Sequence, residues 1–305
     1  MARFVVTRVF QSVLTLFGVL TATFFLVRIA GDPTTLLLPP EATDKDIATL
    51  RQALGLDQSL LVQYAKFLGN TLVGEFGISL RQRTPALGLV LERLPATLEL
   101  AVTAFALGLL IAFVLGLAMR LTGSHRVRAV IMLIALIRQA IPVFWFGLLL
   151  ILLFSVHLRW LPSLGRGTIW HLILPALTLA TYETALYLRL FDASLAAESR
   201  QDYVRTAYAK GLTRIQVLFA HMLPNALLPL ATIAGINLGI LLGGTVVTET
   251  VFSWPGVGRL IVQSVSQRDY PVIIAGVFVV CLIFVAINLL VDLLYAYLDP
   301  RVRLA

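Results

Sequence analysis

The sequence predicts an all-α protein that crosses a membrane several times. Of its 305 residues, 59% are hydrophobic and 13% are charged, and the mean hydropathy is +0.91. This composition is too apolar for an ordinary soluble domain. Six segments are also long enough to cross a bilayer as helices; they lie at 9–29, 97–119, 130–154, 170–191, 226–249 and 271–297. We therefore expect six transmembrane helices.

The first segment lies close to the N-terminus and has the basic flanks of a signal sequence. Its apolar run of roughly 20 residues fills a bilayer, however, and no clear cleavage site of small residues follows it. We interpret residues 1–30 as a retained N-terminal transmembrane helix. Residues 31–95 then form an external segment, residues 96–298 a core of five helices, and residues 299–305 a cytosolic tail.

Basic side chains predict which ends of these helices face the cytosol. Cytosolic loops carry an excess of Lys and Arg, and an even number of spans places both termini on one side. The basic residues on the side of the termini are Arg3, Arg8, Arg120, Arg126, Arg128, Arg189, Arg200, Arg205, Lys210, Arg214, Arg301 and Arg303. Those in the two short opposite loops are Arg159, Arg166, Arg259 and Arg268. Both termini are therefore expected in the cytosol.

The external segment is expected to form short helices. Thr43 and Asp46 have the spacing of a capping box, which opens a helix, and Gly55 can end it. Asp57 or Ser59 can cap a second helix. The apolar residues of this second helix share one face: Leu60, Tyr64, Phe67 and Leu68. The two helices have either a structural role or a docking role on the outer face.

The most informative stretch is the polar insert between the fourth and fifth segments, residues 201–229. Its apolar residues recur at steps of three to five, which predicts one amphipathic helix or two short helices broken near Gly211. The apolar positions are Val204, Ala207, Leu212, Ile215, Phe219 and Met222. Glycine permits a tight bend where a side chain would clash. The apolar stripe is then free for a protein partner or, alternatively, for the surface of an anionic membrane.

This insert resembles the EAA loop of bacterial ABC-importer permeases. The pattern of that loop is Glu-Ala-Ala, three residues, Gly, nine residues, Ile, one residue, Leu-Pro. The residues that match are Ala207, Gly211, Leu223 and Pro224, whereas Arg205, Thr206 and His221 replace the Glu, the first Ala and the Ile. In that family the loop, here 193–224, is a cytosolic coupling helix that docks in a groove of the ATPase subunit. The resemblance assigns ATPase coupling to Asp202, Tyr203, Arg205, Thr206, Ala207, Lys210, Gly211, Leu212, Leu223 and Pro224.

Further motifs extend the resemblance over nearly the whole chain, to the B-type permease of the dipeptide, oligopeptide, nickel and glutathione importers. They are FFLVRIAGDP (24–33), LGLDQSLLVQY (54–64), GEFGIS (74–79), LPATLELA (94–101), VVTETVFSWPGVGRL (246–260), RDYP (268–271) and NLLVDLLYAYLDPRVR (288–303). Glu75 stands where that family commonly has Asp. The SWPG sequence at 253–256 can start a short helix, which the resemblance places in the external gate region.

The resemblance implies a permease subunit of an ABC importer in the bacterial inner membrane. Its implied partners are a second homologous permease, two ATPase subunits, an extracytoplasmic solute-binding protein and the lipid bilayer. This chain is expected to hold no cofactor, because ATP and Mg are bound by the partner ATPases. The implied substrate is a dipeptide or oligopeptide, and the alternatives are a nickel chelate, glutathione or an opine-like compound.

The fifth segment carries three glycines spaced by four residues, Gly235, Gly239 and Gly243. They share one helical face, and such a face lets two helix backbones approach closely. It packs either within this chain or against the second permease subunit.

Two ionisable residues interrupt apolar segments, Arg138 in the third and Glu183 in the fourth. Unpaired charges inside a bilayer are costly, so such residues are paired or functional. Counted from the expected cytosolic ends, both lie roughly 12 Å deep at 1.5 Å per residue. They either form an ion pair or face the pathway and contact the substrate; our hypothesis combines the two, with the pair formed at rest and Arg138 freed as the pathway opens.

No motif indicates an enzyme or a nucleic-acid-binding protein. The phosphate loop GxxxxGK[ST] is absent, as are HExxH and GxSxG. The single cysteine, Cys281, excludes an internal disulfide, and the four histidines are scattered in a way that does not suggest metal ligands. The net charge of +8 is explained by topology. A stand-alone secondary transporter is the rival class, but such proteins tend to show internal repeats, and we find none.

Overall fold

The computed structural model describes residues 2–29, 34, 38, 42–53 and 55–298. The expected cytosolic tail 299–305 and part of the motif at 24–33 lie outside the described residues. Helices make up the architecture of this part of the chain, in the order α1 (Ala2–Ile29), α3 (Asp44–Ala53), α4 (Leu60–Leu72), α5 (Ala86–Thr122), α6 (His125–Ala140), α7 (Val143–Leu150), the π-helical η1 (Ile151–His157), α8 (Ile169–Glu198), α9 (Asp202–Ala209), α10 (Arg214–Val217), the π-helical η2 (Leu218–Met222), α11 (Leu223–Val251), α12 (Val257–Ser266) and α13 (Tyr270–Leu298).

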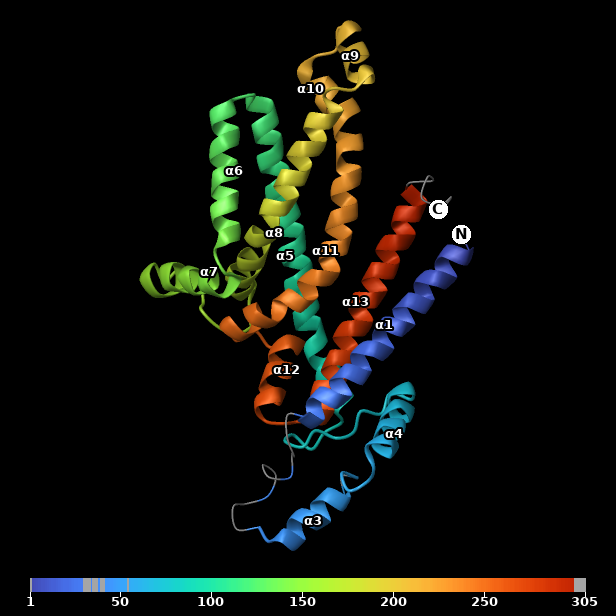
Figure 1. The fold of residues 1–305 in the computed structure, drawn as a ribbon. Helices are drawn as coiled ribbons and strands as arrows, with labels where there is room; N and C mark the ends of the chain where they lie inside the picture. Colours follow the sequence, from blue (N-terminus) through green and yellow to red (C-terminus); the bar gives the residue numbers. More distant parts are fainter. Residues whose placement is uncertain (1, 30–33, 35–37, 39–41, 54, 299–305) are drawn as a thin grey trace. The chain divides into compact units, whose positions relative to one another are not determined.

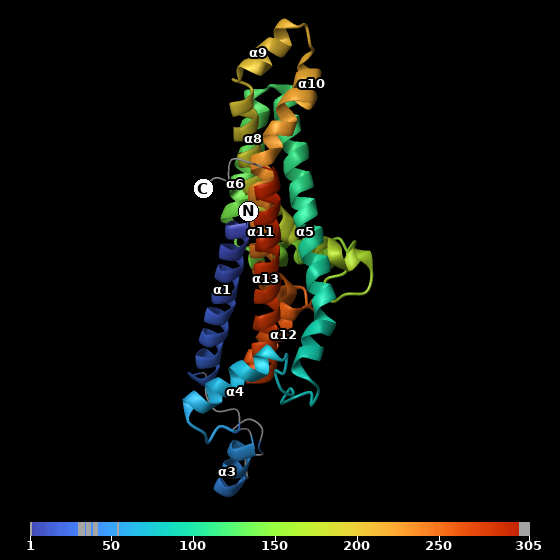
Figure 2. The same cartoon turned by 90° about the vertical axis from the view of Figure 1, so that its right-hand side faces the viewer.

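The chain divides into two compact units. Unit 1 comprises Met1–Thr97 and Pro255–Leu289, and unit 2 comprises Leu98–Trp254 and Leu290–Ala305. Figure 1 labels the helices of both units, and Figure 2 shows them after a quarter turn. Because α5 and α13 each run from one unit into the other, the units do not correspond to separate stretches of sequence.

The all-α fold is confirmed, whereas the count of six spans is not. Four helical stretches among the described residues are long and apolar enough to cross a membrane: Val5–Ile29, Ala86–Thr122, Arg214–Val251 and Tyr270–Leu293. A bent pair of helices, α6 with α7 and η1, can supply a fifth. Helix α8 has 30 residues but is not among them, since polar side chains such as His171 and Glu183 lower its hydropathy.

The continuous third span expected at 130–154 is wrong. Helix α6 ends at Ala140, α7 begins at Val143, and the two parts of the bent pair meet at 105°. Pro142 lies between them. Proline disfavours a helical conformation in the residue before it, and Ile141 accordingly has the extended values φ −81° and ψ 126°. Hydropathy could not reveal this break because the residues on both sides are apolar.

The core of unit 2 is built around α8. This helix packs against α6, α7 and α11, and its buried side chains include Tyr187, Leu188 and Phe191. Helix α5 comes so close to α8 that a Cβ atom added at Gly116 would lie 2.4 Å from the Phe191 ring. In both views, α9 and α10 lie at the end of unit 2 that carries the turn between α5 and α6 (Figures 1 and 2).

Unit 1 contains the short helices expected outside the membrane. The capping box is confirmed: the Asp46 amide donates to the Thr43 hydroxyl at 3.3 Å, the Thr43 amide donates to the Asp46 carboxylate at 3.0 Å, and Gly55 has φ +66° after the end of α3. Helix α4 begins after Ser59, whose side chain makes no capping bond. The rings of Tyr64 and Phe67 both lie against Phe24, each with 5.1 Å between centroids, so two residues of the expected apolar face pack on α1.

The last part of unit 1 is fixed by a buried carboxylate. Asp269, which is 3% exposed, accepts a 2.5 Å hydrogen bond from the Ser79 hydroxyl and a 3.0 Å bond from the Leu80 amide. The neighbouring helix α12 begins at Val257, whose amide donates to the Thr97 hydroxyl at 2.8 Å. A short helix after SWPG is therefore confirmed, although its proline precedes the first turn.

Candidate coupling loop and buried polar residues

The polar insert forms two short helices, α9 and α10, that are broken at Gly211. Gly211 has φ +82°, and its amide donates to the Tyr208 carbonyl at 2.9 Å. The break and the tight bend were predicted, but no clash within this chain explains the glycine. A Cβ atom added here meets no atom of this chain within 4 Å, so Gly211 is required by its backbone conformation, which L side chains rarely adopt.

A second capping box opens α10 and was not recognised in the sequence. The Gln216 side chain accepts from the Thr213 amide at 2.9 Å, and the Thr213 hydroxyl accepts in return from the Gln216 amide at 3.4 Å. The signal was present, because Thr-x-x-Gln is a capping-box sequence. This box places the N-cap of α10 at Thr213, two residues after the break, so the turn has a defined geometry.

The apolar stripe of the insert is divided between the core and the surface. Val204, Ala207 and Met222 are 2%, 4% and 2% exposed and belong to the hydrophobic core of unit 2. Ile215 and Phe219, by contrast, are 60% and 45% exposed. The expectation that the whole stripe is free for a partner is therefore wrong, since about half of it attaches the loop to its own helices.

Three large apolar side chains of the loop are each more than 40% exposed. They are Tyr208 on α9, Ile215 on α10 and Phe219 on η2, and Tyr208 is 47% exposed. We call these three residues the loop patch. An exposed apolar patch beside polar residues is typical of a protein or membrane contact.

Polar contacts tie the loop to the ends of three helices. The Tyr203 hydroxyl donates to the Glu198 carboxylate at the end of α8 and accepts from the Asn225 amide of α11 at 3.1 Å. Burial, together with the bond to Glu198, raises the pKa of Tyr203. The Arg214 guanidinium donates to the Arg120 carbonyl of α5 at 2.5 Å. These contacts connect the loop to α5, α8 and α11.

The remaining coupling candidates are divided between surface and core. Arg205 lies 3.6 Å from Asp202 in an exposed ion pair, which is worth little. Lys210 caps the end of α9. Leu223 is 9% exposed, and Pro224 lies in the first turn of α11. The Leu-Pro pair therefore lies at the junction of η2 and α11, within the helical stretch Arg214–Val251.

Arg138 is a buried clamp at the break between α6 and α7. Its side chain donates to the Thr181 hydroxyl at 2.9 Å, the Thr178 carbonyl at 2.7 Å and the Ile141 carbonyl at 3.2 Å. Its guanidinium carbon also lies 3.8 Å from the centroid of the Phe146 ring. Arg138 is 7% exposed, so this one side chain joins the end of α6, the start of α7 and the middle of α8.

Glu183 has different neighbours, and the expected ion pair with Arg138 is absent from the described structure. The Glu183 carboxylate accepts from the Asn237 amide of α11 at 3.2 Å. The hydroxyl of Tyr187 lies near both groups, although it meets no hydrogen-bond geometry. Arg138 does reach the same part of α8, but it donates to Thr181, Thr178 and Ile141 instead of to Glu183.

The three glycines of α11 have three different environments. A Cβ atom at Gly235 would lie 2.8 Å from both methyl groups of Val291. Gly239 is buried, and Gly243 is exposed with no atom within 4 Å of an added Cβ. Close packing within the chain is thus seen at Gly235.

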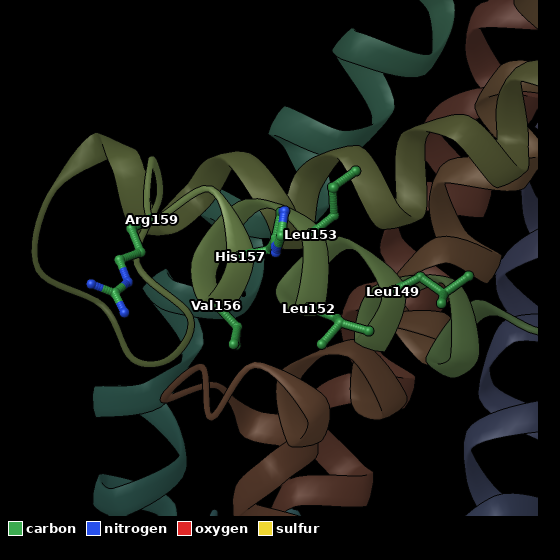
Figure 3. Close-up of a pocket in the computed structure, with 6 residues that line it drawn as sticks. All are labelled: Leu149, Leu152, Leu153, Val156, His157 and Arg159. Atoms are coloured by element: carbon green, nitrogen blue, oxygen red, sulfur yellow. The ribbon is translucent and has the colours of Figure 1, made fainter.

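A shallow hollow of about 740 Å³ lies along α7 and η1. Figure 3 shows the six side chains that line it, all from this one segment: Leu149, Leu152, Leu153, Val156, His157 and Arg159. The sequence does not reveal this hollow, because its lining residues lie in the expected third span and just beyond its outer end.

Family comparisons match both halves of the chain. The family described as "Binding-protein-dependent transport system inner membrane component" matches residues 108–304. Its N-terminal companion, described as "Binding-prot-dependent transport system membrane comp, N-term", matches residues 1–101. Together the two matches cover nearly every residue, including both compact units.

Curated relatives are similar over their whole length. The chain is 40% identical over 315 residues to an oligopeptide transport system permease protein, AppB of Bacillus subtilis, covering 99% of this chain and all of AppB. It is also 40% identical over 304 residues to a glutathione transport system permease protein, GsiC of Escherichia coli K12, covering 99% of each. These matches confirm the family resemblance seen in the motifs.

Solved structures with a similar fold come from ABC transporters. One is an amino acid ABC transporter with histidines, at 18% identity and a TM-score of 0.54, covering 69% of this chain and 94% of that one. Another is the methionine transporter MetNI in an inward-facing conformation, with the same identity and TM-score and coverage of 69% and 96%. At this identity they support the fold alone.

Proposed function

The chain belongs to the family of binding-protein-dependent transport system inner membrane components, and we propose that it forms half of the translocation pathway of an ATP-driven importer for short peptides. The observation that carries this proposal is the coupling loop. It exposes the loop patch at one end of unit 2 and is anchored in the core of that unit at Val204 and Ala207.

The anchoring provides a physical route for coupling. Binding at an interface can affect a distant site when the same rigid secondary-structure element contributes residues to both places. A partner that binds Tyr208, Ile215 and Phe219 holds side chains whose helices also contribute Val204 and Met222 to the core. Closure of the ATPases would pull on this loop and shift α8 and α11, which are packed together. Hydrolysis would then release the shift and return the pathway to its inward-open state.

The proposed assembly contains a second homologous permease, two ATPase subunits and an extracytoplasmic solute-binding protein. This chain is its non-catalytic membrane subunit, and ATP with Mg is bound by the ATPases. Family membership supports an inner-membrane location. We propose that both termini are cytosolic, because the basic residues concentrate on the side of the termini.

Within the pathway, Glu183 is the better candidate for contact with substrate. It is half-buried and has one recorded hydrogen bond to its carboxylate, from Asn237. A carboxylate at this position can accept the ammonium group of a peptide. The Arg138 guanidinium already donates hydrogen bonds to Thr181, Thr178 and Ile141. We therefore assign Arg138 a structural role, in which it holds α6, α7 and α8 together beside the pathway.

The substrate is a short peptide in this proposal, since two relatives are named for oligopeptide and glutathione transport and glutathione is itself a tripeptide. Reconstituted vesicles containing the whole importer should take up di- to pentapeptides only with ATP and the binding protein present. Uptake of a nickel chelate or an opine-like compound without peptide uptake would contradict the substrate. Uptake without the ATPase subunits would contradict the transporter class.

Cysteine labelling tests the proposed topology. After Cys281→Ala, we expect a cysteine at Arg200, which is exposed between α8 and α9, to react with an impermeant maleimide only when the inner face is open. A cysteine at Gln52, exposed on α3, should react from outside in intact cells. The reverse pattern would place the coupling loop outside and exclude contact with cytosolic ATPases.

A further inference from the structure

A cavity with a basic rim and an apolar floor lies between α6 and α8. Its volume is about 490 Å³, and Arg128, Arg189, His125 and Asp192 provide its polar lining. Ala129, Met132 and Leu136 provide apolar walls. The cavity lies wholly within unit 2 and is separate from the loop patch, Arg138 and Glu183.

The electrostatics of this cavity favour an anion. Arg128 is already paired with Asp192, whose carboxylate it contacts at 2.7 Å. Within the described part of the chain, no hydrogen bond or ion pair is recorded for Arg189, which is exposed. One carboxylate therefore faces two guanidinium groups and an imidazole, and the rim retains a positive charge.

The surroundings of the cavity favour a lipid over a free ion. The outward side of α6 is apolar and exposed, with Leu133, Ile134 and Ile137 each more than half exposed. Leu136, in the cavity wall, is 46% exposed, so the apolar wall continues onto this side. Such a surface is suited to acyl chains. Arg128 lies three residues from the start of α6, and Arg189 lies nine residues before the end of α8, so both lie toward the ends of these helices that we propose to be cytosolic.

We propose that the α6–α8 cavity binds the phosphate headgroup of an anionic phospholipid, with Arg189 and Arg128 on the phosphate and Met132 and Leu136 along an acyl chain. Basic pockets between transmembrane helices on the cytoplasmic side bind anionic headgroups in this way. The inference rests on the proposed topology for its assignment to the inner leaflet. The lipid would brace α6 against α8, next to the anchored coupling loop.

Native mass spectrometry of the purified importer tests this site directly. The complex is loaded with phosphatidylglycerol or with phosphatidylcholine, and the retained lipid is measured as detergent concentration rises. We expect preferential retention of phosphatidylglycerol and an approximately fivefold lower retention in Arg189→Gln, as for the loss of one basic contact to an anionic lipid. Arg189 is chosen over Arg128 because its replacement breaks no recorded contact within the chain.

The matched control is Arg126→Gln, which removes the same charge from an exposed residue of α6 that does not line the cavity. Equal losses in the two variants would show a general charge effect and overturn the proposal. Equal retention of the two lipids would also overturn it. Displacement of phosphatidylglycerol by millimolar inorganic phosphate would instead assign the site to a free anion. Because lipid retention is measured without transport, none of these results depends on the proposed import function.

Discussion

Gly211→Val is expected to reduce ATP-driven uptake by at least about fivefold while membrane insertion is unchanged. Gly211 has φ +82°, and a β-branched residue held in this region costs on the order of 1–3 kcal/mol. Because each 1.4 kcal/mol is a factor of ten in population, the loop would leave the conformation that presents the loop patch. Uptake into reconstituted vesicles and the amount of chain in the membrane fraction are the two measurements.

Gly211→Asn separates backbone strain from steric contact. Asparagine tolerates the left-handed region far better than valine, and an added Cβ meets no atom of this chain. If strain is the cause, the Asn variant should retain most of the uptake. Failure of both variants would show that a partner contacts Gly211 directly, and normal uptake by Gly211→Val would remove this turn from the coupling mechanism.

The sequence predicted the turn at Gly211 well because its signals are local. Glycine after an amphipathic run and Leu-Pro at the start of the next helix each dictate the backbone of one or two residues. The same reasoning could not tell which apolar residues of the loop are covered. Val204 and Phe219 belong to the same periodic pattern, but Val204 is 2% exposed and Phe219 45% exposed, and only the packing of α8 and α11 determines that difference.

The prediction of a continuous third span was wrong for a related reason. Hydropathy averages over a window and reports that 130–154 is apolar, whereas one proline changes the direction of the chain by 105°. The depth estimate for Arg138 and Glu183 does not cross this break, because both residues were counted along continuous stretches of α6 and α8. Arg138 does reach α8 near Glu183, at Thr181 and Thr178, but depth alone does not tell which polar groups of a neighbouring helix a side chain contacts, so the predicted pair was wrong although both residues were correctly identified as unusual.

The charge swap Arg138→Glu with Glu183→Arg is expected to be less stable than Arg138→Gln alone. In the swap, a carboxylate at position 138 faces the carbonyls of Thr178 and Ile141, which now accept bonds from the guanidinium. The carboxylate and both carbonyls are hydrogen-bond acceptors, so the carbonyls would lose their donor. Each buried polar group left without a hydrogen bond costs roughly 1–3 kcal/mol. Glutamine keeps a donor near the same carbonyls, so it should lose fewer bonds.

Thermal unfolding of the detergent-solubilised chain, with Glu183→Gln as a control, gives the comparison. Glu183→Gln should have a small effect on stability, because an amide can keep a bond with Asn237, the one recorded donor to this carboxylate. Arg138→Gln should lower the midpoint clearly, and the double swap should lower it further. An ion pair predicts the opposite order, with the swap restoring what each single change removes. If the double swap restored the wild-type unfolding midpoint, Arg138 and Glu183 would pair in a conformation other than this one. The hydrogen bonds of Arg138 at the α6–α7 break would then not be what stabilises this charge in the membrane.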